Sequence, residues 1–284
     1  MEKFPNKEEL EQNELQIIDI VPEKEKYPVP VLVAPGWSTT PKDLEKFMKL
    51  LSEKGRRILS FSHSRKNIIG GPLSLIHSKK EVTEAGKEYS FEEIQKAFSL
   101  LEVLENKNID KVDVVAHSEA GINTSIAASE YPEKFRNIVY VNPAGMIGED
   151  KFPKLLGRFS SESIKNAFKS FLNSETRGSV KTLWKESINY AIKNIPLSWN
   201  EAVAISKSDI KEMLKSLKEK GIGISIVHSE GDKIFPMEKM KKEVGHLVAD
   251  NFIEYEGDHF DIILEPEKMA DLIDSALVSS EDKE

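Results

Sequence analysis

The chain has 284 residues, of which 39% are hydrophobic and 31% charged, and its formal net charge is −8. This length and composition allow one large domain with a full hydrophobic core and room for an insertion. The chain has no cysteine, which excludes disulfides, thiolate catalysis and cysteine-ligated metals.

The distribution of charged and apolar residues sets expectations for partners and location. The acidic balance is spread along the chain without a basic stripe, so nucleic acid is not expected as a partner. No apolar run reaches the roughly 18 residues of a membrane span. The polar, acidic segment after Met1 does not look like a signal peptide. We therefore expect a cytoplasmic protein.

The first half of the chain alternates between apolar strand patterns and amphipathic helix patterns. Helices are predicted to begin at 40–43 and at 90–93, because both segments combine a cap residue with an acid in the first turn. A third helix is predicted over 121–129, directly after an elbow-like turn. The predicted strands of this half span residues 15–21, 29–34, 57–61, 112–116 and 135–141.

The alternation breaks after the strand that ends at Val141. Residues 146–207 contain no strand pattern and are typical of several helices rich in aromatic residues. The alternation then resumes, with strands over 223–228 and 251–255 and helices around them. Strands that alternate with helices predict a mostly parallel central sheet with helices on both faces.

The strand over 112–116 leads into the most informative turn of the chain. A serine between a strand and a helix, with small residues two positions before and after it, is what a nucleophile elbow requires. Here Ala116 and Ala120 stand in place of the two glycines of G-x-S-x-G, around Ser118. Such a turn presents the hydroxyl above its own helix N-terminus, where negative charge is stabilised. An ordinary helix-capping serine is the alternative interpretation.

Two later strand ends carry the residue types that a serine nucleophile needs. Asp232 follows the strand over 223–228, and His259 follows the strand over 251–255. In open α/β sheets, functional groups gather at the carboxyl ends of the strands. The order Ser, Asp, His is also the one expected in an α/β-hydrolase fold. Asp258 and Asp261 flank the histidine and are the alternatives for the acid.

These motifs together resemble those of cap-bearing serine hydrolases of the α/β-hydrolase superfamily, over roughly residues 28–277. The acid loop at 231–236, the histidine loop at 257–261 and the turn at 35–37 carry the likeness. Pro35 stands where the family usually has a histidine. The resemblance implies a core domain formed by residues 1–145 and 208–284, with a helical cap inserted at 146–207.

The resemblance also implies a role for each site residue. His259 takes the proton of the Ser118 hydroxyl, and Asp232 orients the imidazole. The backbone N–H groups of Trp37 and Glu119 form the oxyanion hole. The expected reaction is hydrolysis of a small-molecule carboxylic ester with a small to medium apolar acyl group, through an acyl-serine intermediate. No cofactor is expected, and no metal, because no cluster has metal-ligand spacing.

The substrate pocket is expected to be lined by the cap and by the turn before it. Met146 follows the turn at Gly145, and the cap offers aromatic side chains that suit an apolar pocket. A helical cap also needs a core of its own, which the same side chains can supply. The candidate substrate-binding residues are Met146, Phe168, Phe171 and Trp184.

Other functions stay open at this point. Carbon–carbon bond hydrolases of meta-cleavage diketones use the same three residue types and a helical cap, and the segment 142–145 resembles theirs. Arg158 and Arg177 lie where such an enzyme needs a cation for the substrate carboxylate. A hydrolase-fold receptor, which binds a small ligand and reports it to a partner protein, is a third possibility. Hydrolases with an aspartate nucleophile are contradicted by Ser118.

Overall fold

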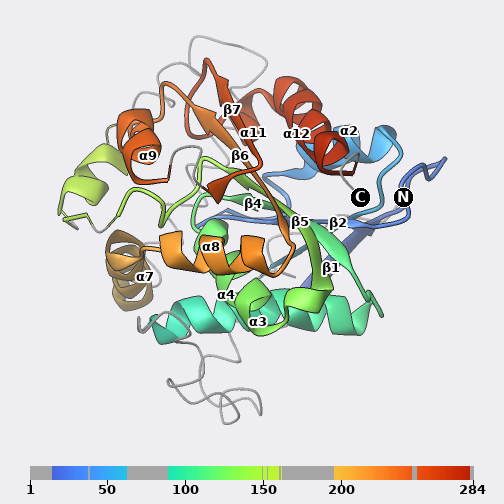
Figure 1. The fold of residues 1–284 in the computed structure, drawn as a ribbon, viewed down its shortest axis with the longest axis horizontal. Coiled ribbons are helices and arrows are strands. Elements are labelled where there is room, and N and C mark those ends of the chain that lie inside the picture. Colours follow the sequence, from blue (N-terminus) through green and yellow to red (C-terminus); the bar gives the residue numbers. More distant parts are fainter. Residues whose placement is uncertain are drawn as a thin grey trace.

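The computed structural model describes residues 15–37, 39–62, 89–148, 150–151, 153–159, 161, 195–244 and 248–281. These residues contain a seven-stranded sheet in the order β1-β3-β2-β4-β5-β6-β7 (Figure 1). Strand β1 is antiparallel to β3, whereas the other neighbouring strands pair in parallel. The mostly parallel sheet predicted from the alternation is therefore confirmed.

The strands end within one or two residues of the predicted limits. Most of the strands are largely continuous apolar runs, because both faces of a parallel sheet are covered by helices. Strands β2 and β4, for example, are buried along their whole length. The strands are β1 (Gln16–Ile20), β2 (Val31–Ala34), β3 (Ile58–Ser62), β4 (Val112–His117), β5 (Phe135–Val141), β6 (Gly223–Ser229) and β7 (Asn251–Tyr255).

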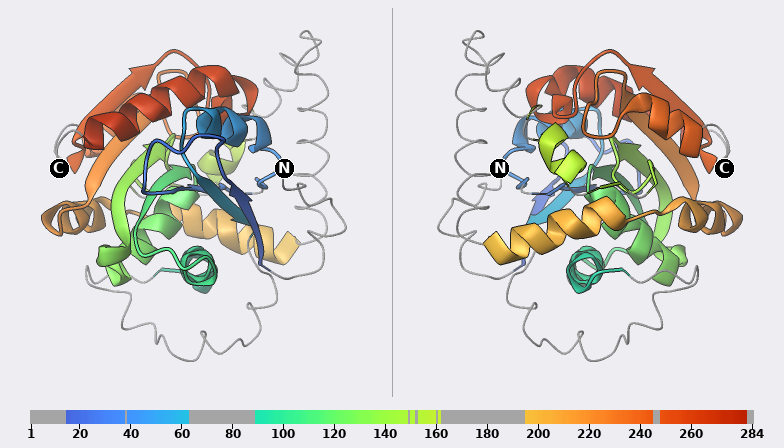
Figure 2. Two further views of the ribbon diagram at one scale, coloured as in Figure 1. Left: turned by 90° about the vertical axis from the view of Figure 1, so that its right-hand side faces the viewer. Right: turned by 90° about the vertical axis from the view of Figure 1, so that its left-hand side faces the viewer.

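Helices cover both faces of the sheet (Figure 2). Helices α2 (Glu45–Glu53) and α12 (Pro266–Glu281) pack together over one face and bury one apolar cluster against it. Helices α3 (Phe91–Asn106), α4 (Ala120–Glu130) and α8 (Lys211–Glu219) enclose a larger cluster on the other face. The remaining helices are α7 (Ile195–Lys207), α9 (Met237–Glu243), α11 (Asp261–Leu264) and a short 3-10 turn, η3 (Pro132–Lys134).

The two predicted helix starts differ in outcome. At α3, Ser90 Oγ accepts the backbone N–H of Glu93 at 3.2 Å, as a capping box requires. At 40–43 capping contacts also form, since the Asp43 carboxylate accepts both the backbone N–H and the hydroxyl of Thr40. The backbone N–H groups of Asp43 and Leu44, however, donate to the carbonyl three residues back, so the chain forms a tight turn before the α-helix. The helix α2 therefore begins later, at Glu45.

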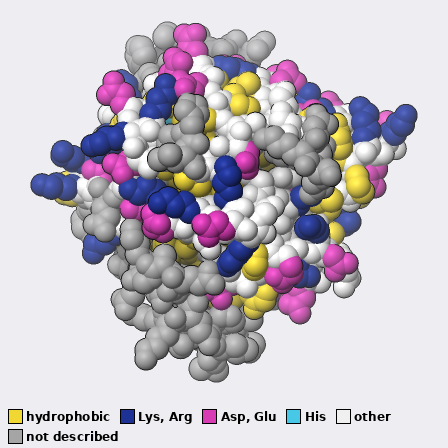
Figure 3. Space-filling model, viewed as in Figure 1, with side chains coloured by type: hydrophobic (Ala, Val, Ile, Leu, Met, Phe, Trp, Pro, Cys, Tyr) yellow, Lys and Arg dark blue, Asp and Glu magenta, His cyan; other side chains and the backbone are white. Residues whose placement is uncertain are grey.

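The predicted cap at 146–207 falls partly outside the described residues. Within it, the structure describes a helical segment at 153–159 and helix α7, which packs against α3. No helix in the described part of the chain is long and apolar enough to cross a membrane. On the face viewed in Figure 1, basic and acidic side chains are interspersed (Figure 3).

Candidate active site

Ser118 occupies the sharp turn between β4 and α4. Its φ of 56° is the left-handed conformation, which is uncommon for residues other than glycine and is seen where the surroundings enforce it. Backbone hydrogen bonds on both sides do so here: Ser118 N–H donates to Val141 O, and Ser118 O accepts from Gly121 and Ala144, all at 3.0–3.1 Å. The elbow predicted from the sequence pattern is thus the conformation in the structure.

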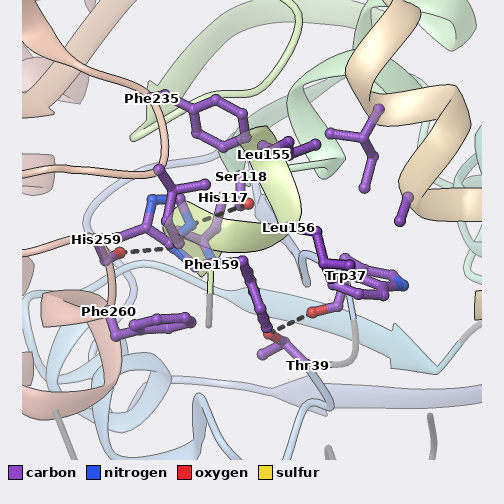
Figure 4. A pocket seen from close by; sticks show the side chains of 13 residues that line it. Trp37, Thr39, His117, Ser118, Leu155, Leu156, Phe159, Phe235, His259 and Phe260 are labelled. Carbon is purple, nitrogen blue, oxygen red and sulfur yellow. Dashed lines mark hydrogen bonds between the residues drawn. The ribbon is translucent and has the colours of Figure 1, made fainter. Parts of the chain in front are cut away.

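The structure brings Ser118, His259 and Asp232 into one hydrogen-bonded series. His259 Nε2 lies 3.1 Å from Ser118 Oγ, and His259 Nδ1 lies 2.7 Å from Asp232 Oδ2. Figure 4 shows the histidine ring directed at the serine from the loop after β7. Both His259 and Asp232 are buried, which strengthens the electrostatic contact between them.

Asp232 is held as a hydrogen-bond acceptor on both of its oxygens. Its second oxygen, Oδ1, accepts the backbone N–H groups of Ile234 and Phe235 at 2.8 and 2.9 Å. Burial acts to raise the pKa of Asp232, but the interactions with His259, together with those with His228 and the Phe235 N–H, outweigh burial and hold the pKa below its usual value. Of the alternative acids, Asp261 is turned away and accepts the backbone N–H of Asp258.

Asn142, at the end of β5, fixes the loops that carry Asp232 and His259. Its amide Nδ2 donates toward His259 O at 3.1 Å and Asp258 O at 3.3 Å, and its Oδ1 accepts Ser229 N–H at 2.8 Å. Its φ of 45° is left-handed, a conformation that asparagine tolerates better than most residues. Asn142 was not among the predicted site residues, although the segment 142–145 was noted for its resemblance to diketone hydrolases; an asparagine directly after a buried strand was the available signal.

His117 is a second support for the histidine loop. Its Nε2 donates to His259 O at 3.1 Å, so this nitrogen carries the proton of the ring. Burial, followed by the neighbouring His259, lowers the pKa of His117 to about 3, and the ring is neutral at physiological pH. His117 therefore acts here as a neutral hydrogen-bond donor.

The two expected oxyanion-hole residues lie on either side of the serine. Gly36 allows the loop before Trp37 to come close, because a Cβ on Gly36 would lie 2.8 Å from His117 O and 3.0 Å from Ser118 Cβ. Glu119 directly follows the serine at the N-terminus of α4. Among the described residues, no hydrogen-bond acceptor is bound to the backbone N–H of Trp37 or Glu119. Both donors are thus left for another acceptor.

Ser118 and His259 open into a pocket lined mainly by apolar side chains. The pocket holds about 490 Å³ of space outside protein atoms, including its mouth. The rings of Trp37, Phe159 and Phe260 lie in series along one wall, with centroids 5.0 Å apart in a tilted contact and 6.0 Å apart in an edge-to-face contact. The other lining residues are Thr39, His117, Leu155, Leu156, Ala202, Ile205, Ile234 and Phe235.

The predicted pocket residues do not coincide with this lining. Met146 is fully buried in the core cluster beneath α4 and α8 and does not line the pocket. Phe168, Phe171 and Trp184 lie outside the described residues. Phe235 and Phe260 were not predicted as pocket residues, although each stands within the acid or histidine loop that carried the resemblance. No group of three or more potential metal ligands occurs in the described residues.

Comparison with known proteins agrees with this architecture. A family model described as the alpha/beta hydrolase fold matches residues 29–266. A search of curated proteins gave no match. Many solved structures share the fold, and those cited next are between 13% and 17% identical to this chain, so their likeness shows the fold alone.

Three of these structures illustrate the range of proteins that share the fold. A bromoperoxidase from Bacillus anthracis is 17% identical, with a TM-score of 0.65 over 93% of this chain and 95% of that chain. A structure from a study of carboxylesterases of the thaumarchaeon Nitrososphaera gargenis is 15% identical, with a TM-score of 0.64 over 95% and 96%. An enol-lactonase from Burkholderia xenovorans LB400 is 13% identical, with a TM-score of 0.63 over 93% and 96%.

Proposed function

We propose, since the chain belongs to the alpha/beta-hydrolase fold family, that it is a serine hydrolase that cleaves carboxylic esters with small to medium apolar acyl groups. The observation that carries the proposal is the hydrogen-bonded series from Asp232 through His259 to Ser118. That series ends at the wall of an apolar pocket. A nucleophile, its base and a group that orients the base are the parts that acyl transfer requires.

In the proposed reaction, His259 Nε2 accepts the proton of Ser118 as Oγ attacks the ester carbonyl carbon. The resulting oxyanion accepts the N–H groups of Trp37 and Glu119, and the positive N-terminus of α4 favours its charge. The imidazolium then gives its proton to the leaving alcohol, and an acyl-serine remains. Water, activated by the same histidine, hydrolyses the acyl-serine and regenerates the free hydroxyl.

The pocket lining supports an apolar ester over a meta-cleavage diketone. A diketone of that class carries a carboxylate, which needs a cation in the pocket. Arg158 pairs instead with Asp150 and is not among the pocket-lining residues that the structure describes. The second candidate cation, Arg177, lies outside the described residues. Apolar contacts favour the hydrocarbon parts of an ester by the ordinary hydrophobic effect.

The test is a comparison of initial rates on p-nitrophenyl esters of graded acyl length, for wild type and Ser118→Ala. We expect turnover with a preference for short and medium chains, and a loss of at least about 10³-fold in Ser118→Ala. A meta-cleavage diketone assayed in parallel tests the alternative. Ester turnover no faster than in Ser118→Ala would contradict the proposal.

A further inference from the structure

The side chains of Trp37 and Glu119 end in the same buried cluster of charges, although their backbones lie on different loops. Lys96, in the second turn of α3, donates to Glu119 Oε1 at 2.6 Å. The same ammonium lies 2.9 Å from Glu201 Oε1 on α7. The indole Nε1 of Trp37 donates to the other oxygen of Glu201, also at 2.9 Å. Four side chains from four segments therefore form one continuous series.

This cluster is withdrawn from solvent, so its contacts are strong and their geometry is restricted. The side chains of Glu119 and Glu201 are 1% and 2% exposed, and that of Lys96 is 11% exposed. Glu93, also buried, is a further acidic neighbour of Glu119. Bringing such ions out of water costs several kcal/mol each, and a buried ion pair is therefore poor evidence for a purely stabilising role. A role in fixing one geometry of the surrounding segments would account for keeping these ions buried despite the cost.

The position of the cluster indicates which geometry it fixes. Trp37 and Glu119 are the residues whose backbone N–H groups receive the oxyanion in the proposed mechanism. Glu201 lies on α7, next to Ala202, which lines the pocket. In Figure 4, Trp37 lies beside this helix. The cluster thus joins the loop after β2, the N-terminus of α4 and a helix of the predicted cap.

We propose that Lys96 is a positioning residue of the hydrolase reaction: with Glu201, it holds the two oxyanion-hole segments at a fixed separation and makes that separation depend on the seating of α7. The inference rests on the proposed function, because the oxyanion belongs to that reaction. Lys96 acts through Glu119 and Glu201 and does not touch the substrate. Its loss should therefore lower the rate of Ser118 attack more than the affinity for substrate.

The decisive variants are Lys96→Met and Glu201→Gln, with Lys96→Arg as the conservative change. Methionine keeps an unbranched apolar stem one atom shorter than that of lysine and removes the ammonium. Glutamine has one acceptor oxygen, so it cannot accept from Lys96 and Trp37 on separate oxygens as Glu201 does. The matched control is Lys107→Met, the same change at the C-terminal end of α3, where the lysine pairs with Asp19.

Two measurements distinguish positioning from stability and from failure of the proposed function. The first is the pair kcat and KM on the best p-nitrophenyl ester. The second is the rate at which a fluorophosphonate labels Ser118, a step in which Oγ bonds to phosphorus, fluoride leaves and the phosphonyl oxygen occupies the oxyanion site. Labelling needs no ester turnover, so it tests Lys96 even where esters are not hydrolysed. Circular dichroism melting reports whether each variant is folded.

We expect Lys96→Met and Glu201→Gln to lower kcat and the labelling rate in parallel by about 10- to 100-fold, since displacement of an oxyanion donor has effects of this size. KM should stay within about threefold, and Lys96→Arg should recover most of the rate.

Folded Lys96→Met and Glu201→Gln with wild-type labelling rates would overturn the proposal, as would an equal loss in Lys107→Met. If Lys96→Met fails to fold, Glu201→Gln alone decides. Wild-type Ser118 that labels but hydrolyses no ester refutes only the proposed function, whereas a wild type that does not label refutes both.

Discussion

The two sides of the candidate active site are fixed by different kinds of contact. On the side of the acid and the histidine, the loops are held by backbone groups and by the neutral side chains of Asn142 and His117. On the oxyanion side, the loops end in buried ions, with Lys96 between Glu119 and Glu201. Both sides lie within one fold and flank the same residue, Ser118.

The difference has physical consequences. A neutral hydrogen bond costs little desolvation and does not titrate, whereas a buried ion costs several kcal/mol of desolvation and changes with pH. The contacts of Asn142 and His117 should therefore be sensitive to the identity of donors and acceptors. The oxyanion side should be sensitive to charge. The predictions that follow test each side by changes that alter one property at a time.

The largest effect is expected from Asp232→Asn. The asparagine oxygen can still accept from Ile234 and Phe235, but its NH₂ group faces His259 Nδ1 and selects the wrong tautomer of the imidazole. We expect kcat on esters to fall by about 10⁴-fold, while the urea midpoint of unfolding stays close to that of wild type. Steady-state rates and urea titration measure both.

The matched control for this change is Asp261→Asn, since Asp261 was, with Asp258, one of the two alternative acids near the histidine in the sequence. An asparagine oxygen at 261 can still accept the Asp258 N–H that the carboxylate accepts now. We expect kcat within about fivefold of wild type. A loss in Asp261→Asn as large as that in Asp232→Asn would mean that the orienting acid has been assigned to the wrong residue.

An intermediate effect is expected from Asn142→Asp, which tests the neutral contacts themselves. The change replaces an amide donor by a carboxylate oxygen that faces the carbonyl oxygens of Asp258 and His259. We expect the free energy of unfolding to fall by about 2–4 kcal/mol, because buried acceptors lose their donor and gain a negative neighbour. Ester turnover should fall with it, as His259 loses a fixed position.

Asn108→Asp is the control for Asn142→Asp. Asn108 also has a left-handed φ, of 52°, but it is exposed after the end of α3. Aspartate tolerates this conformation about as well as asparagine, so the free energy of unfolding should change by less than about 1 kcal/mol. Equal losses at both positions would show that backbone conformation, and not the hydrogen bonds of Asn142, causes the effect.

The sequence predicted the elements of this site better than their packing. The residues of the serine turn, the acid loop and the histidine loop each stand at the end of an apolar strand, and parallel strands bring such ends to one edge. Met146 failed as a pocket residue because Gly145 turns the chain with a φ of 79°, and the following side chain enters the core. A position in the chain does not determine the direction of a side chain after such a turn.

Lys96 shows why the oxyanion side could not be predicted. A lysine in the pattern of an amphipathic helix is predicted to lie on the face exposed to solvent. It is buried here because α7, about a hundred residues later, packs over that face and places Glu201 against it. The direction of β1 is a similar case, since an isolated apolar run predicts a strand without predicting its partner or its orientation.

The smallest effect that we predict is a pH dependence of stability caused by the oxyanion side. Burial raises the pKa of Glu119 from 4.5 to about 7, although Lys96 opposes the shift. The folded protein therefore holds a proton that the unfolded chain releases, so this contribution to stability is complete below about pH 4.5 and is lost as pH rises towards 7. Glu119→Gln cannot titrate. The free energy of unfolding of wild type minus that of Glu119→Gln, from urea titrations, should fall by up to about 3 kcal/mol across this range.

The exposed Glu267 supplies a control of opposite sign. Its hydrogen bond with Lys46 lowers its pKa, so its contribution is present above pH 4.5 and is lost as pH falls. Because both partners are largely exposed, the effect of Glu267→Gln should be small at every pH. A flat difference curve for Glu119→Gln would mean that the pKa of Glu119 is the same in the folded and the unfolded protein, with Lys96 fully compensating its burial. In that case the two sides of the site would differ in charge but not in their response to pH.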